Sequence, residues 1–223
     1  LTVPVQDAGI WRYEKEARAN GYLCIAGVDE AGRGPIAGPV VAAAVMLPPD
    51  LDCEGIRDSK ALTPEARQSA YQRIVEQARA VGVGVIGPEV IDEVNILQAT
   101  YLAMRAALDD MGAACDFILL DGLPVPGLPA DSLAIVDGDA KCVSISAASI
   151  VAKVRRDQIM VEMDSFYPDY GFASHKGYCT PEHLCALERW GPCAIHRRSF
   201  APVLRQAQNE REGQCRLSGI GLV

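Results

Sequence analysis

Three short apolar runs in this chain are followed by carboxylates, and this pattern limits the possible folds more than any other feature. The first run is followed by Asp29 and Glu30, the second by Asp121, and the third by Asp139. A short run of consecutive apolar residues is typical of a strand that is buried on both faces. Because a charged group is costly inside such a strand, acids are expected only at its ends. The pattern therefore predicts a sheet that carries carboxylates at the ends of its strands.

The predicted elements follow one another in the order of an α/β fold. Strands are predicted at residues 23–28, 39–47, 81–86, 117–121 and 132–136, and helices at 10–19, 63–80, 92–111, 146–165 and from 180 onward. The helix start at Thr63 is supported by a side chain that can cap the helix, by Pro64 at the first helical position and by Glu65 at the positive end. Three early strands followed by alternating helices and strands predict a mixed five-stranded sheet flanked by helices.

The composition supports a globular protein and excludes several other classes. The chain has 223 residues, of which 49% are hydrophobic and 22% charged, so a sizeable core can form. No apolar run is long enough to cross a bilayer, and residues 1–20 lack the features of a signal peptide. The eight cysteines include no CxxC pair, which argues against zinc and thioredoxin-like sites. We expect reduced thiols, a cytoplasmic location and no membrane partner.

Charge is unevenly distributed along the chain. The formal net charge is -8, but residues 1–140 hold 10 basic and 21 acidic side chains, whereas residues 141–205 hold 9 basic and 6 acidic ones. The acidic total argues against bulk nonspecific adhesion to nucleic acid. The basic stretch still allows specific phosphate contacts in the C-terminal part of the chain.

The four acids at the predicted strand ends are candidates for a metal site. If these strand ends lie side by side, the carboxylates repel one another and raise one another's pKa. Divalent cations remove this difficulty, and a pair of Mg²⁺ ions about 3.5–4 Å apart can clamp the attacking and leaving oxygens of a phosphodiester. For any one acid alone, the capping of a loop remains the simpler interpretation.

A glycine-rich turn at residues 31–38 follows the first predicted strand. It fits the loose dinucleotide-binding pattern GxGxxA, but residues 39–45 are expected to form a strand where that motif requires a helix. The glycines are better explained by the close approach of bare backbone to a ligand hydroxyl or phosphate. An ordinary hairpin turn remains the alternative.

Several blocks in the same order resemble the ribonuclease HII family. The blocks are residues 27–35 (GVDEAGRGP), 58–63 (DSKALT), 120–122 (LDG), 138–139 (GD), 146–157 (SAASIVAKV followed by Arg156 and Asp157), 175–178 (HKGY) and 196–200 (HRRSF). The resemblance is collinear from about residue 21 to residue 203. A single block would be weak, whereas this ordered series is specific to the family.

The resemblance implies an RNase H-like fold and a metal-dependent endonuclease that acts on RNA within RNA–DNA duplexes. It implies cleavage on the 5′ side of a ribonucleotide, including a lone ribonucleotide embedded in duplex DNA, which leaves 3′-hydroxyl and 5′-phosphate ends. Such an enzyme would remove ribonucleotides from DNA and degrade RNA primers. The residues expected to hold two Mg²⁺ or Mn²⁺ ions are Asp29, Glu30, Asp121 and Asp139, and those expected to read the ribonucleotide junction are Gly32, Arg33, Gly34 and Tyr178.

Other residues are candidates for contact with the rest of the substrate. The candidate substrate contacts are Lys60, Ser149, Lys153 and Lys176, and Arg197 and Arg198 are further candidates for contact with phosphate. Arg156 and Asp157 are expected to form a surface pair or to hold a loop. His175 and His196 are expected to touch phosphate or to pack locally, since the histidine spacing is not that of a zinc site.

We expect a monomer with a single catalytic domain over residues 1–205. Residues of about 160–205 would form a helical extension that binds substrate, and the polar tail at 206–223 is expected to be loose. Two alternatives are a noncatalytic module that binds RNA–DNA hybrids and a DNA junction nuclease of the same fold. A binding module has no need of four chelating acids, and a DNA-only nuclease has no need to read a 2′-hydroxyl. A dinucleotide-binding protein is a more distant alternative.

Overall fold

The computed structural model describes residues 9–49, 51–56 and 62–208. These residues form two compact units: the first takes the described residues up to 31, those of 41–85 and 100–155, and the second takes 32–40, 86–99 and the described residues from 156 onward. Lys60, a candidate substrate contact, lies outside the described residues, as does most of the predicted tail.

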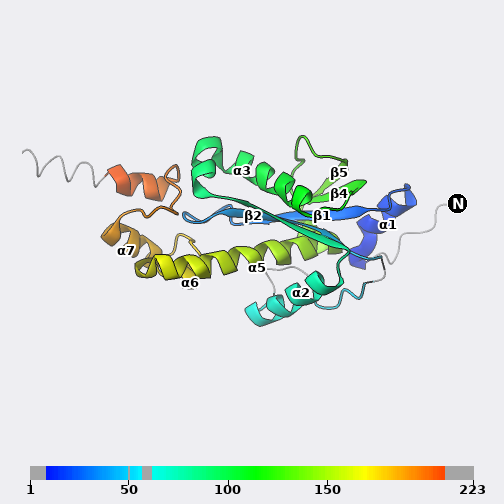
Figure 1. Ribbon diagram of the computed structural model, residues 1–223, viewed down its shortest axis with the longest axis horizontal. Helices are drawn as coiled ribbons and strands as arrows, with labels where there is room; N and C mark the ends of the chain where they lie inside the picture. The colour runs from blue at the N-terminus through cyan, green and yellow to red at the C-terminus, as the bar shows by residue number, and fades with distance from the viewer. Residues whose placement is uncertain (1–8, 50, 57–61, 209–223) are drawn as a thin grey trace, which may run out of the picture. The chain divides into compact units, whose positions relative to one another are not determined.

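A mixed sheet of five strands forms the centre of the first unit (Figure 1). The strands are β1 (Ile25–Ala31), β2 (Val40–Met46), β3 (Ala80–Ile86), β4 (Phe117–Asp121) and β5 (Asp131–Ile135), in the spatial order β3-β2-β1-β4-β5. β1 is antiparallel to β2 and parallel to β4, and β4 is parallel to β5. The predicted fold class, a mixed five-stranded sheet with flanking helices, is confirmed.

Helices make up most of the remaining regular structure. They are α1 (Arg12–Ala19), α2 (Pro64–Gln77), α3 (Pro88–Asp110), α4 (Gly138–Lys141), α5 (Val143–Phe166), α6 (Phe172–His175) and α7 (Pro181–Trp190), with short 3₁₀ turns η1 (Gly9–Trp11) and η2 (Pro168–Tyr170). Residues 201–208 are also helical. The cap predicted for α2 is present, because Thr63 accepts a hydrogen bond from the Ala66 N–H at 3.2 Å.

Helices cover both faces of the sheet in the first unit (Figure 1). On one face, alternate residues of β2 pack with α2 and the first half of α5 in a single apolar cluster. On the other face, β3 presents Gly82 and Gly84, where any added side chain would overlap the backbone of α3. β2 is buried along its whole length, as its uninterrupted apolar sequence predicts.

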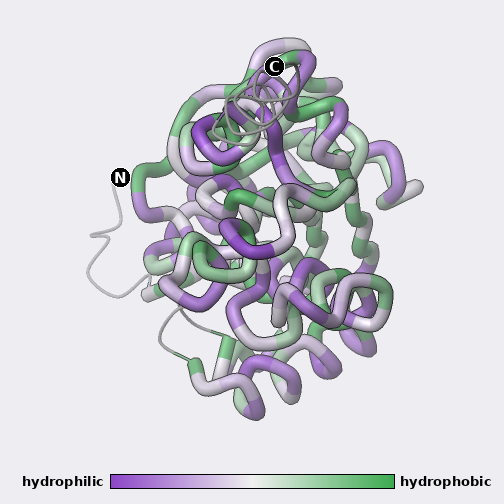
Figure 2. Tube along the Cα trace, turned by 90° about the vertical axis from the view of Figure 1, so that its left-hand side faces the viewer, coloured by the Kyte–Doolittle hydropathy of each residue, from purple (hydrophilic) through white to green (hydrophobic). Residues whose placement is uncertain are grey.

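The second unit has its own small cores. Met160 from α5, Phe172 and Tyr170 pack with Ala37 in one cluster. Leu187 of α7 packs with Ile36 and Val203 in another. Within the described residues, no helix combines the length and the apolar character that a membrane span requires. Hydrophobic and hydrophilic stretches are mixed along the whole trace in Figure 2.

The structure differs from the sequence-based expectation in several local features. α3 begins at Pro88 instead of residue 92 and is interrupted at Asn95, whose φ of 70° lies in the left-handed region. The Asn95 side chain accepts hydrogen bonds from the N–H groups of Leu97 and Gln98, so it caps the part of the helix that follows. The short helices α4 and α6 were not predicted.

Candidate active site

The pairing of β1 with β4 brings two of the predicted metal ligands together. Gly27 pairs with Leu119 and Val28 pairs with Leu120. The next position along this parallel register places Asp29 beside Asp121. Because side chains alternate along a strand, both point to the face on which Gly27 and Leu119 lie. The register alone therefore creates a carboxylate pair at the end of β4, beside a residue that lies two positions before the end of β1.

Asp29 is buried, with an exposed fraction of 4%. Its Oδ1 accepts a hydrogen bond from the Glu30 N–H at 2.7 Å. Burial raises the pKa of Asp29 well above its ordinary value, and the negative charges of Glu30 and Asp121 act in the same direction. A hydrogen bond with Ser149 acts in the opposite direction and lowers the pKa. Asp29, Glu30 and Asp121 are thus close enough to repel one another.

A tight connection between β5 and α4 brings Asp139 to the same strand end. The Gly138 N–H donates a hydrogen bond to Oδ1 of Asp121 at 2.7 Å. A Cβ at position 138 would lie 2.7 Å from Cδ1 of Ile145 and 3.2 Å from Oδ1 of Asp121, so a side chain there would push these two groups aside. Asp139 is the next residue, and it is 4% exposed. The four predicted ligands therefore come from β1, β4 and α4.

Helix α5 lies directly against β1, because Gly27 has no side chain. An added Cβ at position 27 would overlap the backbone of Ser144 and Ile145. This close approach lets Ser149 reach Asp29, and Lys153 lies one helical turn further along the same face. Ser149 and Lys153 were predicted as substrate contacts, and the structure places Ser149 against a predicted metal ligand.

The donor set fits a hard divalent cation. All four predicted ligands supply carboxylate oxygens, which Mg²⁺ and Mn²⁺ prefer. The raised pKa of Asp29 shows that repulsion is present and that a cation could relieve it. Across residues 9–49, 51–56 and 62–208, no three histidine, cysteine or acidic side chains already stand in an arrangement that could hold a metal ion.

The glycine turn belongs to the second unit and begins immediately after β1. Gly32 has a φ of 94°, and a Cβ there would overlap the Arg156 side chain. Gly34 is different, because its φ is outside the left-handed region and a Cβ would meet no protein atom within 4 Å. The protein itself thus requires glycine at position 32, whereas neither its packing nor its backbone conformation requires glycine at position 34.

Tyr178, also predicted to read the junction, is 43% exposed. The Arg156 guanidinium carbon lies 5.7 Å from the centre of its ring. The Tyr178 carbonyl is hydrogen-bonded to Nδ1 of His183 at 2.8 Å. Lys176 has a φ of 52°, and its ammonium donates to the Ala173 carbonyl. The backbone around Tyr178 is therefore held, while its ring remains accessible.

One expectation about arginines is wrong, and another holds in one of its two forms. Arg197 cannot be a direct phosphate contact, because its residue is fully buried and its guanidinium donates to three backbone carbonyls. Arg156 does not form a surface pair, because it too is fully buried; it holds a loop, which was the other expectation. The sequence contained a signal for this burial. Arg156 lies four residues from both Ala152 and Met160, so the helical spacing places it on the buried side of α5.

The three histidines pack against one another. The rings of His175 and His183 are stacked with centroids 4.3 Å apart, and Nε2 of His183 lies 3.0 Å from Nε2 of His196. Burial lowers the pKa of both His183 and His196 to about 4. Local packing, one of the two expected roles, is therefore confirmed for His175 and His196.

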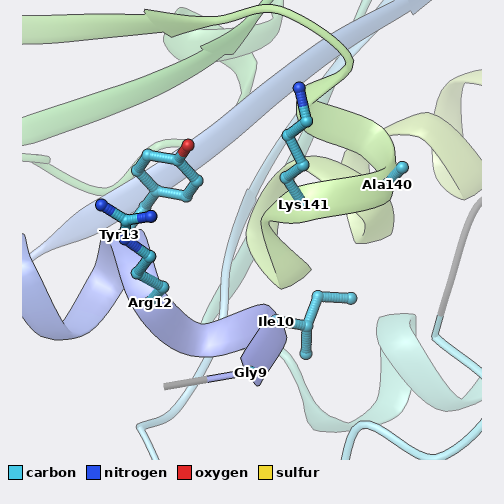
Figure 3. Close-up of a pocket in the computed structure, with 6 residues that line it drawn as sticks. All are labelled: Gly9, Ile10, Arg12, Tyr13, Ala140 and Lys141. Carbon is cyan, nitrogen blue, oxygen red and sulfur yellow. The ribbon is translucent and has the colours of Figure 1, made fainter. Parts of the chain in front are cut away.

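A separate cavity of about 430 Å³ lies within the first unit (Figure 3). Its lining residues are Gly9, Ile10, Arg12, Tyr13, Ala140 and Lys141. Arg12 is paired with Glu16 at 2.8 Å, and the Lys141 ammonium donates to the Val136 carbonyl. None of the predicted site residues lines this cavity.

The chain is similar to known proteins in both sequence and fold. The ribonuclease HII family model matches residues 26–203. A ribonuclease HII of Desulfitobacterium hafniense is 54% identical over 195 residues, which is 87% of this chain and 75% of the relative. A ribonuclease HII of Geobacter sulfurreducens is 50% identical over 208 residues, which is 93% of this chain and 94% of the relative. The crystal structure of ribonuclease H2 from Pyrococcus horikoshii has a TM-score of 0.71 and 28% identity, and the match covers 85% of this chain and 100% of that one. The chain therefore belongs to the ribonuclease HII family, whose members are metal-dependent endonucleases.

Proposed function

We propose that this protein hydrolyses the phosphodiester on the 5′ side of ribonucleotides, both in RNA–DNA hybrids and at single ribonucleotides in duplex DNA. The products would carry 3′-hydroxyl and 5′-phosphate ends. The observation that carries the proposal is the pairing of the buried Asp29 with the half-buried Asp121 on adjacent parallel strands, with the glycine turn following β1 directly in the chain.

Asp29, Glu30, Asp121 and Asp139 would hold the divalent cations, and we propose two of them, Mg²⁺ or Mn²⁺, in the active complex. When bound, such ions lower the pKa of a water and stabilise the leaving oxygen. The chain itself orients the carboxylates. The Gly138 N–H fixes one oxygen of Asp121, and the Glu30 N–H fixes one oxygen of Asp29.

The selection of RNA would come from the 2′-hydroxyl, the group that distinguishes ribose from deoxyribose. The bare backbone at Gly34 supports an approach by substrate, because no side chain shields it and no packing constraint explains the glycine. The exposed ring of Tyr178 would support the adjacent sugar. Gly32 and Arg33 would complete the turn, and the candidate contacts elsewhere on the substrate are Lys60, Ser149, Lys153 and Lys176.

In this proposal the enzyme removes ribonucleotides from DNA and degrades RNA primers. It acts as a monomer in the cytoplasm, with one catalytic domain over residues 1–205. The alternatives are a noncatalytic hybrid-binding module and a DNA junction nuclease. The desolvated carboxylates argue against the first, since a module that only binds an anionic duplex gains nothing from buried negative charge.

A cleavage assay tests the proposal. The substrate is a duplex of DNA with one ribonucleotide, and the controls are an all-DNA duplex and a reaction with a chelator. We expect incision only at the ribonucleotide and only with free divalent cation. Binding without incision would support the noncatalytic module, and incision of all-DNA junctions would support the junction nuclease.

The variant Tyr178→Ala tests the assignment of the junction reader. We expect incision at the single ribonucleotide to fall far more than affinity for the same duplex, because phosphate contacts supply most of the affinity. If both fall by the same factor, Tyr178 is an anchor and does not read the junction.

A further inference from the structure

Two buried arginines hold the glycine turn from inside the second unit. Arg197 donates from Nε to the Gly38 carbonyl at 2.9 Å and from its two terminal nitrogens to the Arg33 carbonyl at 3.0 Å and the Gly32 carbonyl at 2.6 Å. Arg156 donates to the carbonyls of Pro39, Ala37 and Lys176, at distances of 3.0–3.2 Å. Each guanidinium thus makes three hydrogen bonds to backbone oxygens.

The two Arg197 contacts at the start of the turn fix the direction of two peptide planes. In a trans peptide the carbonyl of one residue and the N–H of the next point in opposite directions, and the described chain has no cis peptide. Because the Gly32 and Arg33 carbonyls face Arg197, the N–H groups of Arg33 and Gly34 must face away from it.

The Gly34 N–H is the more informative of these two groups. Gly34 is exposed, and its N–H has no acceptor in the part of the chain that the structure describes. A Cβ on Gly34 would meet open space. A donor that is held in one direction, is unshielded and lacks a protein acceptor is suited to bind an oxygen of a ligand.

Arg156 connects this turn to Tyr178. Its side chain fills the space that a Cβ on Gly32 would need, and its guanidinium donates a hydrogen bond to the Lys176 carbonyl. The guanidinium carbon lies 5.7 Å from the centre of the Tyr178 ring. The backbone supports the same connection, since the Ile36 N–H donates to the Gly177 carbonyl at 2.9 Å. The two predicted ribose-reading elements are therefore held in one fixed arrangement.

The choice of arginine follows from the number of donors. A guanidinium offers five N–H donors in a rigid fork, whereas a lysine ammonium offers three donors at a single point. Neither guanidinium forms an ion pair with a described carboxylate. Burial lowers the pKa of both groups. Two buried cations without ion-pair partners are costly, and here the carbonyl dipoles that accept their hydrogen bonds offset part of that cost.

We propose that Arg197 is a positioning residue that aims the Gly34 N–H at the 2′-oxygen of the substrate, and that Arg156 holds Tyr178 in register with it. This inference rests on the proposed function, because it specifies how the glycine turn recognises ribose. Neither arginine touches the substrate.

The test is Arg197→Lys, which keeps the positive charge and removes the fork. Single-turnover incision of the duplex with one ribonucleotide gives the rate in the bound state, and titration in chelator gives the affinity. A displacement of about 1 Å at a reacting centre costs roughly 100-fold in rate. We therefore expect a loss of about 100-fold in rate, with affinity unchanged within about threefold. The matched control is Arg189→Lys, because Arg189 is exposed on α7 and stacks on Trp190.

A second measurement uses the unaltered protein and so does not depend on the folding of the variant. With glycine labelled with ¹⁵N, the Gly34 amide signal is identified by its disappearance in Gly34→Ala. We expect this signal to shift with the ribonucleotide duplex and not with the all-DNA duplex. In folded Arg197→Lys the difference between the two duplexes should be lost.

The outcomes separate the inference from the proposed function. A rate for Arg197→Lys that equals the control rate, or an equal loss of rate and affinity, would overturn the positioning role. A Gly34 signal that responds alike to both duplexes would do the same. In these cases incision by the unaltered protein would leave the proposed function intact, whereas no incision by the unaltered protein would remove the proposed function itself.

Discussion

Gly34→Ala should separate the activity of this enzyme from its stability. The backbone at position 34 has no positive φ, and the added methyl would meet no protein atom within 4 Å. Replacing a glycine by alanine at such a position stabilises a protein by about 0.4–1 kcal/mol, because the unfolded chain loses conformational freedom. The free energy of unfolding should therefore stay the same or rise by up to about 1 kcal/mol.

The incision rate, unlike the free energy of unfolding, should fall. The methyl would stand beside the N–H that is proposed to approach the 2′-oxygen, and a displacement of about 1 Å costs roughly 100-fold in rate. Such a loss corresponds to about 2.7 kcal/mol of transition-state stabilisation. The assay is single-turnover incision at one ribonucleotide, measured beside urea unfolding of the same preparation.

Gly87→Ala is the matched control for this experiment. Gly87 also has no positive φ, and its added Cβ would approach nothing nearer than the Glu89 carboxylate at 4.0 Å. The control should retain its incision rate. If Gly34→Ala cuts within threefold of the unaltered protein, substrate does not approach the backbone at position 34, and the account of ribose recognition is wrong.

Three further predictions concern charge. Asp29→Asn should abolish incision, and near-normal turnover would show that Asp29 does not belong to the metal site. The same variant should stabilise the metal-free protein, because it removes a buried charge that Glu30 and Asp121 repel; urea unfolding in chelator measures this effect. Mg²⁺ at a hundredfold excess over its Kd should stabilise the protein by about 2.7 kcal/mol. The measurement is a rise in melting temperature that chelator reverses, and an unchanged melting temperature would argue against the metal site. Because the pKa values of His183 and His196 are lowered to about 4, the unfolded chain binds protons below pH 6.5 that the folded protein does not, so stability should be full above pH 6.5 and fall as the pH drops toward 4. The loss should develop between pH 6.5 and pH 4, and His183→Gln should reduce the slope of the free energy of unfolding against pH in that range. An unchanged slope would show that other groups cause it.

The signal for the acids is local, and it located one of two strand ends correctly. Asp121 is the last residue of β4, as an acid after a run of apolar residues predicts. The end predicted for the first strand is wrong, because β1 continues through Asp29 and Glu30 to Ala31 while it pairs with β2. The adjacency of Asp29 and Asp121 depends on the pairing of β1 with β4, which joins segments far apart in the chain. The sequence could only suggest that these carboxylates converge. The register of β1 with β4 shows that Asp29 and Asp121 lie side by side.

The burial of Arg197 could not be predicted with the same rules. An arginine in sequence is most often exposed, and only backbone oxygens delivered by distant segments allow the complete burial of Arg197. The interruption at Asn95 is likewise set by an unusual backbone conformation within an otherwise helical sequence. The assignment of Arg197 to phosphate failed because its acceptors belong to the protein.

The parallel pairing of β1 with β4 also has a consequence for biosynthesis. Asp121 follows Asp29 by 92 residues, so the first carboxylate leaves the ribosome well before the second exists. At about 5–20 residues per second, this interval lasts roughly 5–18 s. During that time β1 can pair with β2, its neighbour in sequence, but the carboxylate pair cannot form. A nascent chain that stops before β4 would therefore be unable to assemble the metal site, and nuclease activity would begin only after the strand that carries Asp121 has joined the sheet.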